Sequence, residues 1–233
     1  FLVIQKLRSL ISSKNLSTNL GDEGGFAPSL SNNEEAIEFI LEAIENAGFK
    51  AGTDISICLD VAANELYTEK KYAVSSSKFL SSDKTIEYYL NLIKKYPIKS
   101  IEDPFFEDDW DTWVNFTKIL NKKDVQLVGD DLFVTNKERL LKGINLKAAN
   151  AVLIKPNQIG TLTETIEVIN LAQQNSYKTI ISHRSGDSED TFIADLAVAT
   201  NSSQIKTGSL ARSERVAKYN RLLRIEDELG NSA

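Results

Sequence analysis

The chain has 233 residues, of which 42% are hydrophobic and 26% are charged. This length allows one sizeable core, so we expect a single domain over residues 1–233. No apolar run approaches the roughly 20 residues of a membrane span, and no secretory signal opens the chain, so a cytoplasmic protein is expected. The net charge of −6 argues against a nucleic-acid surface, which is usually basic along one face.

The first half of the chain mixes helices with loops. Residues 1–11 have the pattern of an amphipathic helix, and residues 17–20 that of a short strand. The loop at 21–28 follows, with glycines that permit unusual backbone angles, and it holds Glu23 at a strand end. Residues 61–80 predict a hairpin-like excursion. Capping boxes, with a hydroxyl three residues before a glutamate, predict helix starts at Ser31 and Glu34, Thr135 and Glu138, and Thr161 and Glu164.

Six short apolar runs read as strands, and helical patterns separate most of them. Cys58 is the single cysteine; it lies in the first run, which predicts a packed rather than reactive thiol and excludes an internal disulfide. Alternating strands and helices predict a parallel α/β barrel, whose strands deliver their C-terminal ends to one mouth. The six runs lead to Asp60, Glu102, Asp130, Lys155, His183 with Arg184, and Lys206.

Including residues 17–20, we count about seven strands. A closed (β/α)₈ barrel needs eight, so at least one further strand is expected upstream of Phe1.

Three of these strand ends are acidic. Asp60, Glu102 and Asp130 would repel one another strongly unless a cation lies among them. Oxygen ligands alone favour Mg²⁺ over zinc. Any one of these acids is as readily explained as a helix cap or a solvated side chain. Three on consecutive strands favour a metal site.

The remaining strand ends are basic. Lys155 must be neutral to act as a base, and a neighbouring metal or Lys206 disfavours the ammonium form. Taken alone, a strand-end lysine is more often an ion-pair partner. Arg184 and Ser185 begin a loop able to hold a phosphate through a charged fork, a hydroxyl and backbone amides. His183 is the only histidine, and a lone histidine is usually structural.

Several long motifs, in one order and across essentially the whole chain, resemble the enolase family. They are Gly-Asp-Glu-Gly-Gly-Phe-Ala-Pro at 21–28, Ser-Ile-Glu-Asp-Pro at 100–104, Gly-Asp-Asp at 129–131, Leu-Ile-Lys-Pro-Asn-Gln-Ile-Gly-Thr at 153–161, Ser-His-Arg-Ser-Gly at 182–186, Glu-Asp-Thr-Phe-Ile-Ala-Asp at 189–195, Gln-Ile-Lys-Thr-Gly at 204–208 and Ala-Arg-Ser-Glu-Arg at 211–215. The resemblance implies the C-terminal (β/α)₈ TIM barrel of a bacterial-type enolase.

The resemblance also implies a reaction, the reversible dehydration of 2-phosphoglycerate to phosphoenolpyruvate by phosphopyruvate hydratase, a glycolytic lyase. In that reaction Lys155 would remove the proton beside the carboxylate, and Glu23 would protonate the departing hydroxyl. Asp60, Glu102 and Asp130 would hold one Mg²⁺, and a second Mg²⁺ would arrive with substrate.

Substrate contacts follow from the same resemblance. Arg184 and Ser185 would bind the phosphate, Lys206 would face the carboxylate and His183 would line the pocket. Glu102 and Asp130 would border the substrate as well as the metal.

The resemblance places further parts of a whole enolase outside the chain. They are the N-terminal α+β domain with its mobile serine loop, and the first barrel strand. We therefore expect residues 1–233 alone not to turn over substrate.

The family also implies partners and alternatives. It implies a homodimer or higher homo-oligomer, a surface or secreted fraction, and contacts with plasminogen or an RNA-degrading assembly, without direct nucleic-acid binding. Two other readings stay open: another acid dehydratase or cycloisomerase of the superfamily, and a catalytically silent scaffold. The phosphate loop and the Glu23 loop argue against the first, and the intact acids and lysines against the second.

Overall fold

The computed structural model describes residues 1–75 and 77–230. Its centre is a six-stranded parallel sheet in the order β1-β5-β6-β7-β8-β9. The strands are β1 (Ile57–Asp60), β5 (Ile98–Glu102), β6 (Gln126–Gly129), β7 (Ala151–Ile154), β8 (Lys178–Ser182) and β9 (Gln204–Lys206). All six runs predicted to be barrel strands are therefore confirmed.

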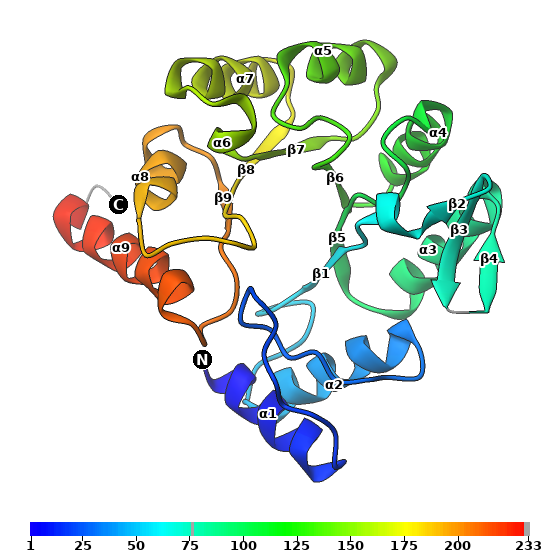
Figure 1. The fold of residues 1–233 in the computed structure, drawn as a ribbon, viewed down its shortest axis with the longest axis vertical. Coiled ribbons are helices and arrows are strands. Elements are labelled where there is room, and N and C mark those ends of the chain that lie inside the picture. The colour runs from blue at the N-terminus through cyan, green and yellow to red at the C-terminus, as the bar shows by residue number, and fades with distance from the viewer. Residues whose placement is uncertain (76, 231–233) are drawn as a thin grey trace.

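Helices surround the curled sheet, as Figure 1 shows in a view onto the ring that the strands and helices form. They are α1 (Leu2–Ser13), α2 (Asn33–Asn46), α3 (Ser82–Lys95), α4 (Trp110–Leu120), α5 (Lys137–Leu146), α6 (Pro156–Ile159), α7 (Leu162–Gln174), α8 (Phe192–Ala199) and α9 (Ser213–Leu229). This is the expected α/β architecture, a half-barrel with β1 and β9 at the two ends of the sheet. No helix in the described ranges is long and apolar enough to span a bilayer.

The apolar sequence of the strands explains why they lie inside the ring of helices. All four residues of β7 are buried, as expected for a parallel strand covered on both faces. Between the sheet and α4, Phe105 packs edge-on against Trp113 and Phe116, with ring centroids 6.0 and 5.3 Å apart. Parallel register then aligns the strand ends: Asp60 is the partner of Glu102 across β1 and β5.

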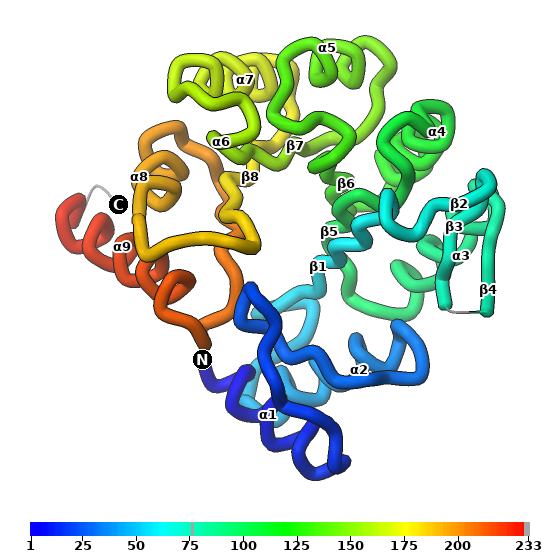
Figure 2. Tube along the Cα trace, in the orientation of Figure 1, coloured from blue at the N-terminus to red at the C-terminus, as the bar shows by residue number. Residues whose placement is uncertain are grey.

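The predicted strand at residues 17–20 is wrong. Leu20 makes only an isolated antiparallel bridge with Phe26. The chain turns back on itself there, because Gly21 N donates to Gly25 O at 2.9 Å and Ala27 N to Asn19 O at 3.3 Å. Figure 2 shows this segment, in blue after α1, running toward the centre of the ring. The segment thus forms a loop and leaves the parallel sheet with six strands.

The predicted excursion between β1 and α3 is present. It consists of η1 (Ala63–Leu66) and an antiparallel sheet of β2 (Tyr67–Thr68), β3 (Lys71–Ser75) and β4 (Lys78–Leu80).

Two of the three predicted caps are displaced by one residue. Asn32, not Ser31, caps α2 by accepting from Glu35 N at 2.9 Å. Asn136, not Thr135, caps α5. Asparagine is an equally good cap, so a nearby asparagine competes with the hydroxyl residue. Thr161 caps α7 as predicted.

Cys58 also differs from the prediction, because its side chain is exposed rather than packed. It lies on β1, an end strand of the sheet. Partial burial, reinforced by Glu102, raises the pKa of the thiol, which still disfavours the reactive thiolate.

Candidate active site

The strand ends bring two lysines and three acids together at one mouth. We call Asp60, Glu102, Asp130, Lys155 and Lys206 the acid–lysine ring. From β9, Lys206 Nζ reaches Asp60 Oδ2 at 2.6 Å and Glu102 Oε1 at 2.9 Å. Because β9 and β1 lie at opposite ends of the sheet, this contact links the two end strands of the curled sheet.

Lys155 occupies the other side of this ring. Its Nζ pairs with Asp130 Oδ2, and both side chains are mostly buried. The Lys155 backbone is fixed by Thr135, whose buried hydroxyl accepts from Lys155 N at 2.9 Å and donates to Gln158 Oε1 at 2.7 Å. Thr135, predicted as a helix cap, therefore supports the candidate base.

Burial and charge make the acidic positions favourable for a cation. Burial raises the pKa of Glu102 to about 7, and Asp60 and Asp130 reinforce this against the opposing effect of Lys206. Asp130 Oδ1 is buried and lacks a hydrogen-bond partner among the described residues. A hard cation would satisfy such an oxygen, so the carboxylate donors present fit Mg²⁺.

A second acid group overlaps the predicted one. Oxygens of Asp103, Asp130 and Asp131 all lie within 4.8 Å of one another. Asp103 has a structural task, because its carboxylate accepts from Asp130 N at 2.9 Å and Asp131 N at 2.7 Å. It holds the turn that presents Asp130. In the described chain Asp60 and Glu102 are instead drawn to Lys206 and form no equally compact group with Asp130.

Glu23 lies against the β8 loop. Its Oε2 is 3.3 Å from His183 Nε2, and its Oε1 accepts from Ser185 Oγ at 3.0 Å. The contact with His183 is close but too poorly aligned to count as a full hydrogen bond. His183, followed by Ser185 and Lys206, nevertheless lowers the pKa of Glu23 to about 2 although partial burial opposes this. Glu23 is thus a carboxylate at neutral pH.

The candidate phosphate loop follows β8. Arg184 is exposed, and its Nη1 donates to Asn157 Oδ1 at 3.1 Å. The Arg184 backbone N–H is already bonded to Asp187 Oδ2 at 3.1 Å, so this amide is not free for an anion. A cavity of about 310 Å³ borders His183 and Arg184.

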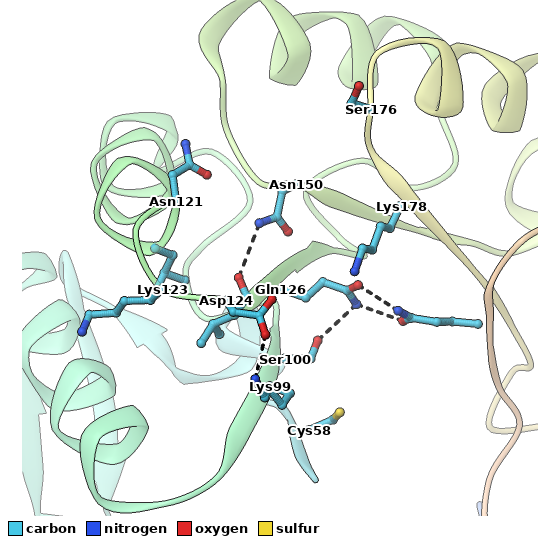
Figure 3. A pocket seen from close by; sticks show the side chains of 13 residues that line it. Cys58, Lys99, Ser100, Asn121, Lys123, Asp124, Gln126, Asn150, Ser176 and Lys178 are labelled. Carbon is cyan, nitrogen blue, oxygen red and sulfur yellow. Dashed lines mark hydrogen bonds and ion pairs between the residues drawn. The ribbon is translucent and has the colours of Figure 1, made fainter. Parts of the chain in front are cut away.

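A second hollow, of about 490 Å³, opens at the N-terminal end of the strands. Figure 3 shows Lys99, Lys178 and Gln126 among its lining residues. Lys99 pairs there with Asp124 at 2.7 Å. This hollow contains none of the predicted site residues, because they lie at or beside the opposite, C-terminal ends of the strands.

The comparisons with known proteins agree with this arrangement. The sequence model of the family "Enolase, C-terminal TIM barrel domain" matches residues 2–233. The chain belongs to this enolase family. It is 64% identical over 233 residues to the enolase of Pelagibacter ubique (strain HTCC1062), covering 100% of the chain but 55% of that relative. The chain therefore spans about half the length of the curated relative it matches.

One buried residue of this enolase barrel had no role in the sequence analysis. Arg215, from α9, reaches into the junction of the Glu23 loop and the β8 loop. The sequence places it in the motif at 211–215, but only the fold reveals which carbonyls it meets. The one signal in the sequence was that Arg215 is a basic residue on the face of a helix that becomes buried.

Proposed function

We propose that the whole protein to which this chain belongs is an enolase that interconverts 2-phosphoglycerate and phosphoenolpyruvate with Mg²⁺. The observation that carries the proposal is a continuous set of charged groups at one mouth. Lys155 pairs with Asp130, and Lys206 pairs with Asp60 and Glu102. The charge of Lys206 also helps to lower the pKa of Glu23. A candidate base and a candidate acid thus flank one acidic centre.

Asp60, Glu102 and Asp130 would hold the first Mg²⁺, and a second would arrive with substrate. Bound there, Mg²⁺ would supply positive charge beside the substrate carboxylate as negative charge develops on it. Asp103, through its bonds to Asp130 N and Asp131 N, keeps Asp130 in place for this task.

Lys155 is the proposed base that removes the proton next to the carboxylate. Its anchored backbone and its largely buried side chain limit the positions that Nζ can take. Lys206 would face the carboxylate. Two unit charges about 4 Å apart interact by about 4 kcal/mol at an effective dielectric constant near 20, so a fixed cation favours the added negative charge.

Glu23 is the proposed acid that protonates the departing hydroxyl. With its pKa lowered to about 2 by His183 and its other neighbours, Glu23 must first gain a proton. A bound phosphate next to Ser185 would favour this, because a nearby negative charge disfavours ionisation of a carboxyl group. Arg184 and Ser185 are the proposed phosphate ligands, and His183 lines the pocket.

We propose that residues 1–233 act as one barrel domain in a cytoplasmic homo-oligomer of at least two subunits, of which a fraction reaches the cell surface or is secreted. Plasminogen and an RNA-degrading assembly are candidate secondary partners. Neither is needed for the proposed chemistry.

The direct experiment mixes the full-length protein with 2-phosphoglycerate and Mg²⁺ and follows the absorbance of phosphoenolpyruvate. The proposal predicts turnover that EDTA abolishes. Substrate analogues without the phosphate should not react, whereas another acid dehydratase of the superfamily would accept one. Turnover unaffected by EDTA, or no reaction of 2-phosphoglycerate, would contradict the proposal.

A further inference from the structure

Arg215 joins two loops that are far apart in the sequence. Its side chain is fully buried, with a relative exposure of 0%. The guanidinium donates four hydrogen bonds, from Nη1 to His183 Nδ1 at 2.7 Å and Arg184 O at 2.7 Å, and from Nη2 to Asp22 O at 3.1 Å and Ser185 O at 2.6 Å. One side chain therefore connects the Glu23 loop with the β8 loop.

Arg215 is held mainly by these hydrogen bonds and not by a close ion pair. The carboxylate of Glu214 is 3.7 Å from Arg215 Nε, which has no hydrogen-bond partner among the described residues. All four acceptors are neutral. Burying a cation is costly, and the hydrogen bonds in the planar fork of the arginine, together with the nearby Glu214 carboxylate, offset that cost here.

The contact with His183 fixes the tautomer of the imidazole. A guanidinium has donors and no acceptor, so His183 Nδ1 must accept the hydrogen bond. The ring proton is then on Nε2, the nitrogen that lies 3.3 Å from Glu23 Oε2. Arg215 thereby keeps the ring proton on the nitrogen nearest the carboxylate of Glu23.

The backbone leaves space for this arrangement at Gly208. A Cβ built there would lie 2.7 Å from Glu23 O and 2.8 Å from Arg215 Cδ, and Gly208 has φ +79°. The side chain of any other residue would clash with both the Arg215 side chain and the Glu23 backbone.

We propose that Arg215 is a positioning residue for the acid half of the reaction: it keeps the ring proton of His183 on Nε2, the nitrogen nearest the Glu23 carboxylate, and holds the Arg184–Ser185 segment beside it. This inference rests on the proposed function, in which Glu23 assists departure of the hydroxyl. Among the described residues no hydrogen bond or ion pair joins Arg215 to Lys155, so at saturating substrate its effect on the two rates should be confined to elimination.

Lys218 provides a matched comparison one turn along α9. It is equally buried and bonds Asp187 Oδ1 at 3.0 Å and Glu214 O at 2.7 Å, together with Ser188 O. It therefore holds the far part of the same loop without contacting His183. Farther along α9, Arg221 pairs with Asp195 of α8 and with Glu228, away from both loops, and serves as the unaffected control.

The test measures two rates in the full-length enzyme: exchange of the substrate C2 proton with D₂O, and formation of phosphoenolpyruvate. Arg215→Lys should lower elimination on the order of 10- to 100-fold, the effect of losing one hydrogen bond to a charged group, with little change in exchange. Lys218→Met should lower apparent substrate affinity without changing the ratio of the two rates. Arg221→Met should behave as wild type.

A folded Arg215→Lys variant with an unchanged ratio, or with the same ratio change as Lys218→Met, would overturn the inference. If this variant does not fold, ¹⁵N NMR of histidine-labelled wild type decides, with the His183 signals identified by their loss in His183→Asn. A proton on Nε2 and a bare, accepting Nδ1 support the inference, and a protonated Nδ1 overturns it. Wild-type protein that neither exchanges nor eliminates would instead refute the proposed function, while the tautomer would still report on Arg215.

Discussion

At the scale of single residues, the candidate site depends on groups whose positions are fixed by neighbours outside the chemistry. Lys155 is anchored through its backbone by Thr135, and Asp130 through its backbone by Asp103. Sequence patterns could predict Lys155 and Asp130 because they end apolar strands. The supporting partners are 20 and 27 residues away in the chain and meet them only after folding.

Replacing Thr135 tests the anchoring of Lys155. Thr135→Val removes the acceptor of the Lys155 N–H and should cost about 1–3 kcal/mol of stability, the usual penalty of an unsatisfied buried group. In the full-length enzyme it should also slow C2 proton exchange. The control is Thr165→Val, because Thr165 is equally buried but its hydroxyl bonds, among the described residues, only the carbonyl of Thr161 at the start of its own helix. Equal exchange rates in the two variants would show that Thr135 does not position Lys155.

The low pKa of Glu23 predicts a pH effect on stability. Its folded-state pKa of about 2 lies below the ordinary 4.5, so ionised Glu23 stabilises the fold above pH 4.5, and this contribution is lost as the pH falls toward 2. Urea midpoints of the wild type should therefore fall more steeply than those of Glu23→Gln between pH 5 and 3. The corresponding difference in the free energy of unfolding should be well below about 1.4 kcal/mol per pKa unit, because Glu23 is partly exposed. Parallel curves would contradict the assignment.

At the scale of elements, the order of strands and helices could be predicted from the sequence, but their exact limits and partners could not. The buried runs of β7 and β8 have the apolar continuity of covered parallel strands. Residues 17–20, Ser-Thr-Asn-Leu, lack this apolar continuity, and the glycine loop that follows folds the chain back on itself. Local propensity does not specify whether a strand partner is available.

Gly208 tests how closely the Glu23 loop and α9 approach each other. Gly208→Ala combines a positive φ with a clash, whereas Gly48→Ala has φ +85° and nothing within 4 Å of its Cβ. The left-handed backbone alone costs roughly 1–2 kcal/mol per residue. Gly208→Ala should therefore lower the free energy of unfolding by more than Gly48→Ala, and it alone should slow elimination. Equal losses of unfolding free energy in the two variants, measured by chemical denaturation, would show that the structure accommodates a Cβ at Gly208 without a clash.

At the scale of the whole molecule, the curled sheet converts six separate strand ends into one site. Asp60 and Lys206 lie on the two end strands, and their 2.6 Å contact joins opposite ends of the sheet. The sequence could predict that these ends share one face because parallel strands all point the same way. It could not predict which acid pairs with which lysine, since that depends on the curvature of the sheet.

Metal binding should depend on acids from three different strands. In the full-length protein, Asp60→Asn, Glu102→Gln and Asp130→Asn should each weaken Mg²⁺ binding by at least about tenfold, or about 1.4 kcal/mol, because each removes a charged oxygen ligand. Calorimetric titration with Mg²⁺ measures this. Asp124→Asn, at the opposite end of the strands, should bind as wild type. Unchanged affinity in all three site variants would place the metal elsewhere.

The most direct test of the central claim separates the two proton-transfer groups of the mouth. In the full-length enzyme with 2-phosphoglycerate, C2 proton exchange with D₂O reports on the base and phosphoenolpyruvate formation reports on the acid. Glu23→Gln should keep exchange and lose elimination, and Lys155→Ala should lose both. Loss of exchange in Glu23→Gln together with retained exchange in Lys155→Ala would contradict the account.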